Sequence, residues 1–144
     1  MSLDMYLEKK TYVGSNRDKL KITGVKSRID IARVVYIVED IAYWRKANAI
    51  HQWFVNNVQK SEDDCKPYHV CTEQLRKLFE LCKQVQKEPD MAPELLPTQE
   101  GFLFGSTDYD ARYFQSIAYT IDVLWAEFKE HDDQSQEYEY QSSW

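Results

Sequence analysis

The strongest helical period in this sequence lies in its last third, and it constrains the fold more than any other feature. Apolar side chains recur there at steps of three or four: Phe114, Ile117, Ile121, Leu124 and Phe128. This spacing places them on one face of a helix, and Trp125 widens that face. Residues 106–108, Ser-Thr-Asp, offer three candidate N-caps for this helix. Because an apolar face must be buried, the rest of the chain must provide a layer for it to pack on.

Four segments have a composition typical of β-strands. They are residues 3–8, 31–41, 68–70 and 101–105. The first alternates apolar and polar residues, and the second contains a β-branched run. A helix would also explain the second segment, because Val34, Val38 and Ile41 fit helical spacing. We favour a strand that passes into a helix near residues 42–46.

Two further helices are expected in the middle of the chain. The first has an apolar face formed by Ala47, Ile50, Phe54 and Val58. It should end near Asn56-Asn57. The second should have Thr72 as its N-cap, and it buries Leu75, Leu78, Cys82 and Val85. The Lys-rich segment 13–27 and the Pro-rich segment 87–97 read as connections. Together, the elements predict an α+β fold, with about three helices packed on one face of a small antiparallel or mixed sheet.

The 144 residues are close to the usual size of one domain, and we expect a single α+β domain over residues 1–130. Residues 131–144 contain four acidic side chains, no Lys or Arg, and several Gln and Ser residues. Such a composition buries too little apolar surface to offset the entropy of ordering. We therefore predict an acidic, disordered C-terminal tail, in which Tyr138, Tyr140 and Trp144 leave open a short docking motif.

Charge and hydropathy exclude some classes of protein. The net charge of −6 argues against generic nucleic-acid binding, which requires a surplus of Lys and Arg. No stretch approaches the roughly 20 apolar residues of a membrane span, and the N-terminus lacks the pattern of a signal peptide. Cys65, Cys71 and Cys82 are irregularly spaced, so we expect free thiols in a reducing compartment. These features predict a cytoplasmic protein with no membrane partner.

The densest group of functional residue types lies in residues 43–54. On a continuous helix, Trp44, Asn48 and His51 would share a face at positions i, i+4 and i+7, with Arg45 beside them. This set could bind a planar anionic ligand: the aromatic ring stacks, the guanidinium holds the anion and the amide fixes an edge. The alternative is that Trp44 and His51 are semi-buried residues where the helix meets the sheet.

A second group, Gly105-Ser106-Thr107, precedes the last helix. Backbone N–H groups and hydroxyls at a helix start can hold an anion, so Ser106 and Thr107 join the candidate ligand-binding residues. However, Asp108 and Asp110 would occupy the favourable site at the helix dipole themselves and repel a phosphate. Helix capping is therefore the competing interpretation.

Metal-binding and catalytic motifs give weaker signals. Cys65 and Cys71 are six residues apart, unlike the CxxC pairs of structural zinc sites, although His69 and Cys71 could share a strand face. The sequence contains no GxSxG, no Walker motif and no GxGxxG. We predict no metal and no cofactor, and we assign no catalytic residue.

Two stretches carry a family resemblance. They are Tyr43–Val55, continuing to Asp63-Asp64-Cys65, and Leu95–Thr98 together with Gly105–Asp110. With the N-terminal Met-Ser-Leu-Asp, they resemble the signature of a family of small uncharacterised bacteriophage and prophage proteins, over roughly residues 1–128. The resemblance implies the cytoplasm of a host cell, where small acidic phage proteins modulate host enzymes or counter host defences.

The leading hypothesis is a non-enzymatic, phage-type accessory protein that binds a host protein or a small anionic ligand. One alternative is a small hydrolase or nucleotide-processing enzyme that uses His51 and Arg45, with Asp108 or Asp110 brought close by folding. Another is a structural or assembly protein of the virion, for which homo-oligomerisation would be expected.

Overall fold

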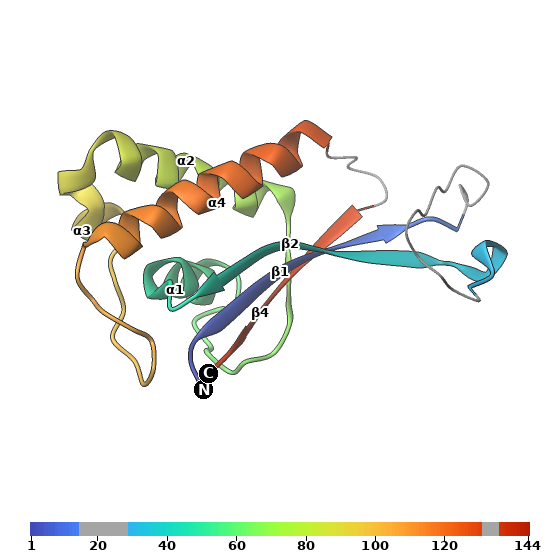
Figure 1. Ribbon diagram of the computed structural model, residues 1–144, viewed down its shortest axis with the longest axis horizontal. Helices are drawn as coiled ribbons and strands as arrows, with labels where there is room; N and C mark the ends of the chain where they lie inside the picture. Colours follow the sequence, from blue (N-terminus) through green and yellow to red (C-terminus); the bar gives the residue numbers. More distant parts are fainter. Residues whose placement is uncertain (15–28, 131–135) are drawn as a thin grey trace.

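The computed structural model describes residues 1–14, 29–130 and 136–144. Within these residues, four strands form one antiparallel sheet in the order β2-β1-β4-β3. The strands are β1 (Asp4–Tyr12), β2 (Tyr36–Arg45), β3 (Tyr68–Val70) and β4 (Gln136–Ser143). β1 and β2 form a long ribbon, which continues beyond the helices on the right of Figure 1. The short helix η2 (Ile31–Arg33) lies near the far end of this ribbon.

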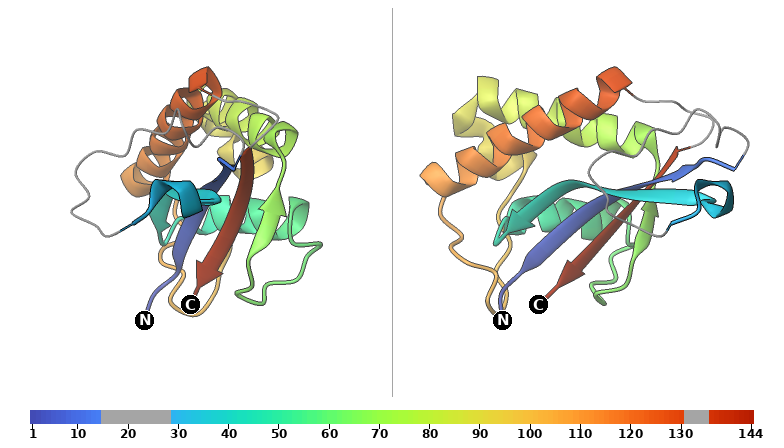
Figure 2. Two further views of the ribbon diagram at one scale, coloured as in Figure 1. Left: turned by 90° about the vertical axis from the view of Figure 1, so that its right-hand side faces the viewer. Right: turned by 45° about the vertical axis from the view of Figure 1, so that its right-hand side comes forward.

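The helices pack on one face of the sheet. They are α1 (Asn48–Asn57), α2 (Thr72–Lys87), η3 (Pro89–Met91), α3 (Ala92–Leu95) and α4 (Ala111–Glu130). α2 and α4 lie side by side above the sheet (Figures 1 and 2). α1 packs on the same face, because its Phe54 stacks on Tyr140 of β4 with ring centroids 3.8 Å apart. The predicted α+β fold is confirmed.

Alternation along β1 forms the centre of the core. Leu3, Met5 and Leu7 point toward the helices and are fully buried. Lys9 continues the same row, and its ammonium contacts the Glu127 carboxylate of α4 at 2.8 Å. Burial by itself lowers the pKa of Lys9, but the hydrogen bond and charge of Glu127 outweigh this effect and raise it. Tyr138 also donates a hydrogen bond to Glu127, so this buried pair joins β1, β4 and α4.

The prediction of a disordered tail is wrong for residues 136–143. These residues form β4, which pairs with β1 on one side and β3 on the other. Tyr138 and Tyr140 face the core and are almost completely buried, whereas Glu137 and Glu139 face solvent. This is the period of two expected for a strand with one buried face, and the acidic average composition concealed it. Residues 131–135 lie outside the described part of the chain.

Other element boundaries were predicted with mixed success. Strands at 3–8 and 68–70, the helix end near Asn57 and the apolar face of α2 are confirmed. The expected strand and helix around residues 31–58 also exist, but the strand runs on to Arg45. The chain then turns at Lys46, which has φ 56°, and α1 begins at Asn48.

Two local predictions are wrong. Residues 101–105 form a turn instead of a strand, because Leu103 and Gly105 adopt positive φ angles of 62° and 87°. The N-cap of α2 is Cys71 rather than Thr72, and its thiol accepts a hydrogen bond from the Gln74 N–H. In the segment expected to be a loop at 13–27, residues 15–27 lie outside the described residues. No helix of the described chain is long and apolar enough to span a membrane.

Candidate functional site

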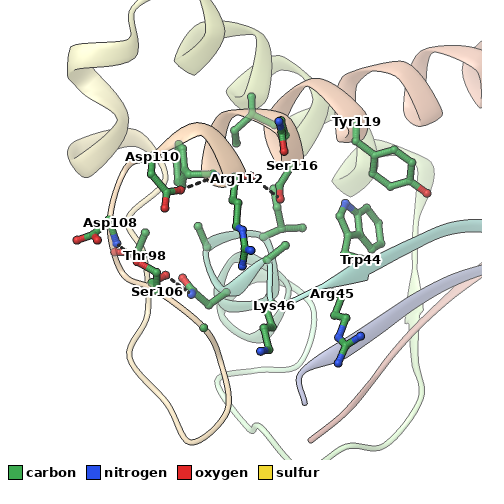
Figure 3. A pocket seen from close by; sticks show the side chains of 18 of the residues that line it. Trp44, Arg45, Lys46, Thr98, Ser106, Asp108, Asp110, Arg112, Ser116 and Tyr119 are labelled. Carbon is green, nitrogen blue, oxygen red and sulfur yellow. Dashed lines mark hydrogen bonds between the residues drawn. The ribbon is translucent and has the colours of Figure 1, made fainter. Parts of the chain in front are cut away.

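A cavity of about 500 Å³ lies between the end of β2, the start of α1 and the first half of α4 (Figure 3). We call it the β2–α4 pocket. Its basic lining residues are Arg45, Lys46 and Arg112, and its acidic lining residues are Asp108 and Asp110. The loop before α4 closes one side with Thr98, Gly105 and Ser106. The pocket therefore combines segments that are about 70 residues apart in the chain.

The basic side chains of the pocket carry charge without matching counter-ions. Arg112, in the first turn of α4, points into the pocket toward Lys46 (Figure 3). Among the described residues, neither Arg112 nor Lys46 forms an ion pair. Arg45 uses its Nε to donate a hydrogen bond to Ser2 at 3.2 Å. With three basic and two acidic side chains, the lining carries a net charge of +1, which favours an anionic ligand.

One carboxylate of the pocket, that of Asp110, is hydrogen-bonded to the backbone. Asp110 immediately precedes α4, and its Oδ1 accepts a hydrogen bond from the Tyr113 N–H at 3.1 Å. Asp110 therefore caps this helix, and the cap predicted at residues 106–108 is wrong. Ser106 lines the pocket, but its hydroxyl accepts a hydrogen bond from the Asp108 N–H at 3.0 Å. Thr107 is not a lining residue, and its carbonyl accepts a hydrogen bond from the Thr98 hydroxyl.

Trp44 forms a wall of the pocket instead of an open stacking surface. Its side chain is 3% exposed, and its indole Nε1 donates to the Thr120 hydroxyl at 2.9 Å. The more accessible ring belongs to Tyr119 of α4, which meets Trp44 edge to face at 6.1 Å and is 38% exposed. The Tyr119 hydroxyl accepts a hydrogen bond from the Tyr43 N–H, so it also satisfies a backbone group of β2. Tyr119 is thus the ring on which a planar ligand could rest.

Asn48 shapes the pocket rather than presenting a free amide to it. The side chain is 3% exposed and lies in the first turn of α1. Its Nδ2 donates to the carbonyls of Phe104 and Ser106 at 3.1 and 2.9 Å, and its Oδ1 accepts from the Gln99 N–H at 3.0 Å. These three hydrogen bonds hold the loop that precedes α4 in place as the wall of the pocket.

His51 lies outside the pocket. It is fully buried, and its Nδ1 and Nε2 lie 2.7 Å from the Tyr140 hydroxyl and 3.0 Å from the Asp63 carboxylate. An imidazole with a proton on Nε2 donates to Asp63, and its Nδ1 bonds to the Tyr140 hydroxyl. Burial raises the pKa of Tyr140 well above its ordinary value, which keeps the phenol protonated. The structure therefore places His51 in a closed network that joins α1, β4 and the segment after α1.

The structure brings together four of the predicted site residues and separates two. Trp44, Arg45, Asn48 and Ser106 line one pocket, whereas His51 and Thr107 do not. The prediction assumed one helix from Trp44 to His51, but the turn at Lys46 divides these residues between β2 and α1. Sequence reasoning missed three residues: Lys46, Arg112 and Tyr119. A usable signal existed for the last two, because Arg112, Ser116 and Tyr119 follow i, i+4, i+7 spacing beside the apolar stripe of α4.

The remaining candidates for chemistry are separate from the pocket. All three cysteines carry free thiols, and Cys82 is buried, which raises its pKa to about 12. In the part of the chain that is described, no group of three or more His, Cys, Asp or Glu side chains is arranged to hold a metal ion. Comparisons with protein-family models, curated proteins and solved structures found no match.

Proposed function

We propose that this protein binds a small anionic ligand in the β2–α4 pocket. The observation that carries the proposal is the pair of cations, Arg112 and Lys46, which share one cavity and have no ion-pair partner among the described residues. Both side chains are exposed beside the same cavity, and a bound anion would give each of them an opposite charge. The volume of about 500 Å³ is in the range of small-molecule sites.

Different lining residues would contact different parts of such a ligand. The planar guanidinium of Arg112 suits a carboxylate or phosphate, which it can hold by two parallel hydrogen bonds. Lys46 adds a point charge from the opposite side of the pocket. Tyr119 offers a partly exposed ring for a planar group, and Asp108, at the edge of the pocket, is an acceptor for a hydroxyl or amine of the ligand.

The cellular setting remains part of the proposal. The sequence segments that resemble bacteriophage and prophage proteins support an accessory role in an infected host cell, either by ligand binding or by contact with a host protein. An enzyme that uses His51 together with Arg45 is less favoured, because His51 is enclosed and Arg45 lines the pocket. A role in virion assembly would require a homo-oligomer, which size-exclusion chromatography with light scattering measures directly.

The test is a binding screen with matched variants. Aromatic carboxylates, nucleoside monophosphates and sugar phosphates are screened by thermal shift, and the tightest anion is titrated by calorimetry. We expect the Lys46→Gln/Arg112→Gln double variant to raise the Kd by at least about tenfold, because each lost charge-assisted hydrogen bond is worth about 1.5 kcal/mol or more.

The control for this screen removes the same charge elsewhere. Arg33→Gln/Lys77→Gln changes an exposed Arg in η2 and an exposed Lys in α2, and it should leave the Kd within about twofold of the wild type. Equal losses in both double variants would mean that general charge, and not the pocket, holds the anion. Absence of binding by every anion in the panel would also count against the proposal.

A further inference from the structure

The face of the sheet that points away from the helices carries an unusual set of side chains. We call it the outer sheet face. On the other face, Met5, Leu7 and Lys9 of β1 are buried beneath the helices, as is Leu3 just before the strand. The intervening positions of β1 and their Cα partners on β2 and β4 therefore point outward. Figure 2 shows α2 and α4 on one side of the sheet only, and no described helix packs on the outer side.

Two pairs of tyrosines cross from β1 to β2 on this face. Tyr6 and Tyr43 have ring centroids 5.4 Å apart, and so do Tyr12 and Tyr36. All four side chains are 39–50% exposed, and Val38 between the pairs is 57% exposed. Tyrosine offers a large contact area at a small entropic cost, and it is enriched in protein interfaces. The aromatic content of the outer sheet face therefore favours a protein partner.

A row of carboxylates crosses the same face between the tyrosine pairs. Asp40 of β2 is the Cα partner of Glu8 of β1, and Glu8 is the Cα partner of Glu139 of β4. Side chains directly opposite each other in an antiparallel pair are about 5 Å apart at Cβ, so these like charges repel. Within the described residues, none of the three forms an ion pair. His69 of β3 follows Glu139 in the row.

The charge of the whole face is negative. Five carboxylates point outward (Asp4, Glu8, Asp40, Glu137 and Glu139), against two basic side chains, Lys10 and Arg45, which leaves a local charge of −3. A hollow of about 250 Å³ lies within the row and is lined by Tyr6, Glu8, Glu139 and Gln141. Repelling carboxylates beside such a hollow favour a partner that inserts a cation between them.

We propose that the outer sheet face docks a Lys- and Arg-rich segment of another protein. A basic side chain in the hollow between Glu8 and Glu139 removes their repulsion and gains two ion pairs. The flanking tyrosines accept further cations over their rings, as Tyr36 already does with Lys10, whose Nζ lies 4.2 Å from the ring centroid. The carboxylate row disfavours nucleic acid on this face, because phosphates would meet negative charge. Tyr43 and Arg45 border both this face and the β2–α4 pocket, but the carboxylate row that carries the docking proposal does not line the pocket, so either proposal can fail without the other.

The probe is a fluorescein-labelled peptide in which Arg and Thr alternate, titrated with the full chain at low and at physiological salt. The test variant is Glu8→Gln/Asp40→Asn/Glu139→Gln. The control variant, Glu94→Gln/Glu100→Gln/Asp122→Asn, makes the same change in net charge at exposed positions off this face. We expect the test variant to weaken peptide binding at least about tenfold and the control about twofold or less.

The Tm of the test variant distinguishes a loss of docking from damage to the fold. Since the test variant removes like-charge repulsion, its Tm should equal or exceed that of the wild type. Equal weakening in both triple variants, or no binding of the peptide by the wild type at low salt, would overturn the proposal. A change of oligomeric state confined to the test variant would also overturn it, because the occupant would then be a second copy of this chain.

Discussion

The network around His51 and the β2–α4 pocket both contain ionisable side chains, but they differ in how many of these side chains have partners. Both nitrogens of His51 are bonded, to Tyr140, which is fully buried like His51 itself, and to Asp63, which is partly exposed. In the pocket, Arg112 and Lys46 have no ion-pair partner among the described residues. Imidazole, carboxylate and phenol therefore act structurally in the first region. The exposed cations of the second are available to a ligand.

The largest expected effect on stability comes from His51→Ala. The substitution leaves a cavity and removes partners from the Tyr140 hydroxyl and the Asp63 carboxylate, so unfolding free energy should fall by about 3–5 kcal/mol. Denaturant unfolding measures this, with Gln52→Ala on the same helix as the control at about 0.5 kcal/mol or less. If His51→Ala does not fold, Tyr140→Phe should still fold and lose about 1–2 kcal/mol. Stability unchanged in both variants would contradict a structural role for this network.

Asn48→Ala should both destabilise the protein and loosen the loop that forms a wall of the pocket. It removes three hydrogen bonds from a buried amide and leaves the Gln99 N–H and two carbonyls without these partners, so we expect a loss of about 2–3 kcal/mol in unfolding free energy. The loop before α4 should also become more mobile, which hydrogen exchange of residues 98–106 would detect. Asn57→Ala, at the exposed end of the same helix, serves as the control. Exchange that increases equally throughout the protein would show that Asn48 does not act on this loop specifically.

Alkaline pH should weaken the core by a smaller amount. Burial raises the pKa of Cys82 from 9.0 to about 12, so the folded state holds its proton while the unfolded state releases it. This contribution is fully present below pH 9 and is lost as the pH rises from about 9 to 12, by about 1.4 kcal/mol up to pH 10. Denaturant unfolding at pH 8 and pH 10 measures this effect. Between these two pH values, the unfolding free energy of the Cys82→Ala variant should decrease by about 1.4 kcal/mol less than that of the wild type. An identical decrease in the wild type and the variant would contradict the assigned cause.

The sequence predicted local features of the fold better than long-range ones. The apolar faces of α2 and α4 repeat every three or four residues, so a short window reveals them. β4 was missed because its stability depends on pairing with β1 at the opposite end of the chain, and only the alternation of Tyr138 and Tyr140 indicated it. The site residues were also hard to predict where they depend on long-range contacts. Arg112 and Lys46 line the same pocket only after α4 has folded back over the end of β2, and a left-handed residue at position 46 has no signal in the local composition.

An anion should bind in the β2–α4 pocket and not at the His51 network. Chemical-shift mapping of the isotope-labelled protein with the tightest anion from the screen tests its location most directly. Binding in the pocket predicts that backbone shifts concentrate in residues 45–50, 98–108 and 110–119, together with the Nε–H signal of Arg112. Shifts centred on Tyr140 and Asp63, or on the outer sheet face, with the pocket residues unmoved, would contradict it.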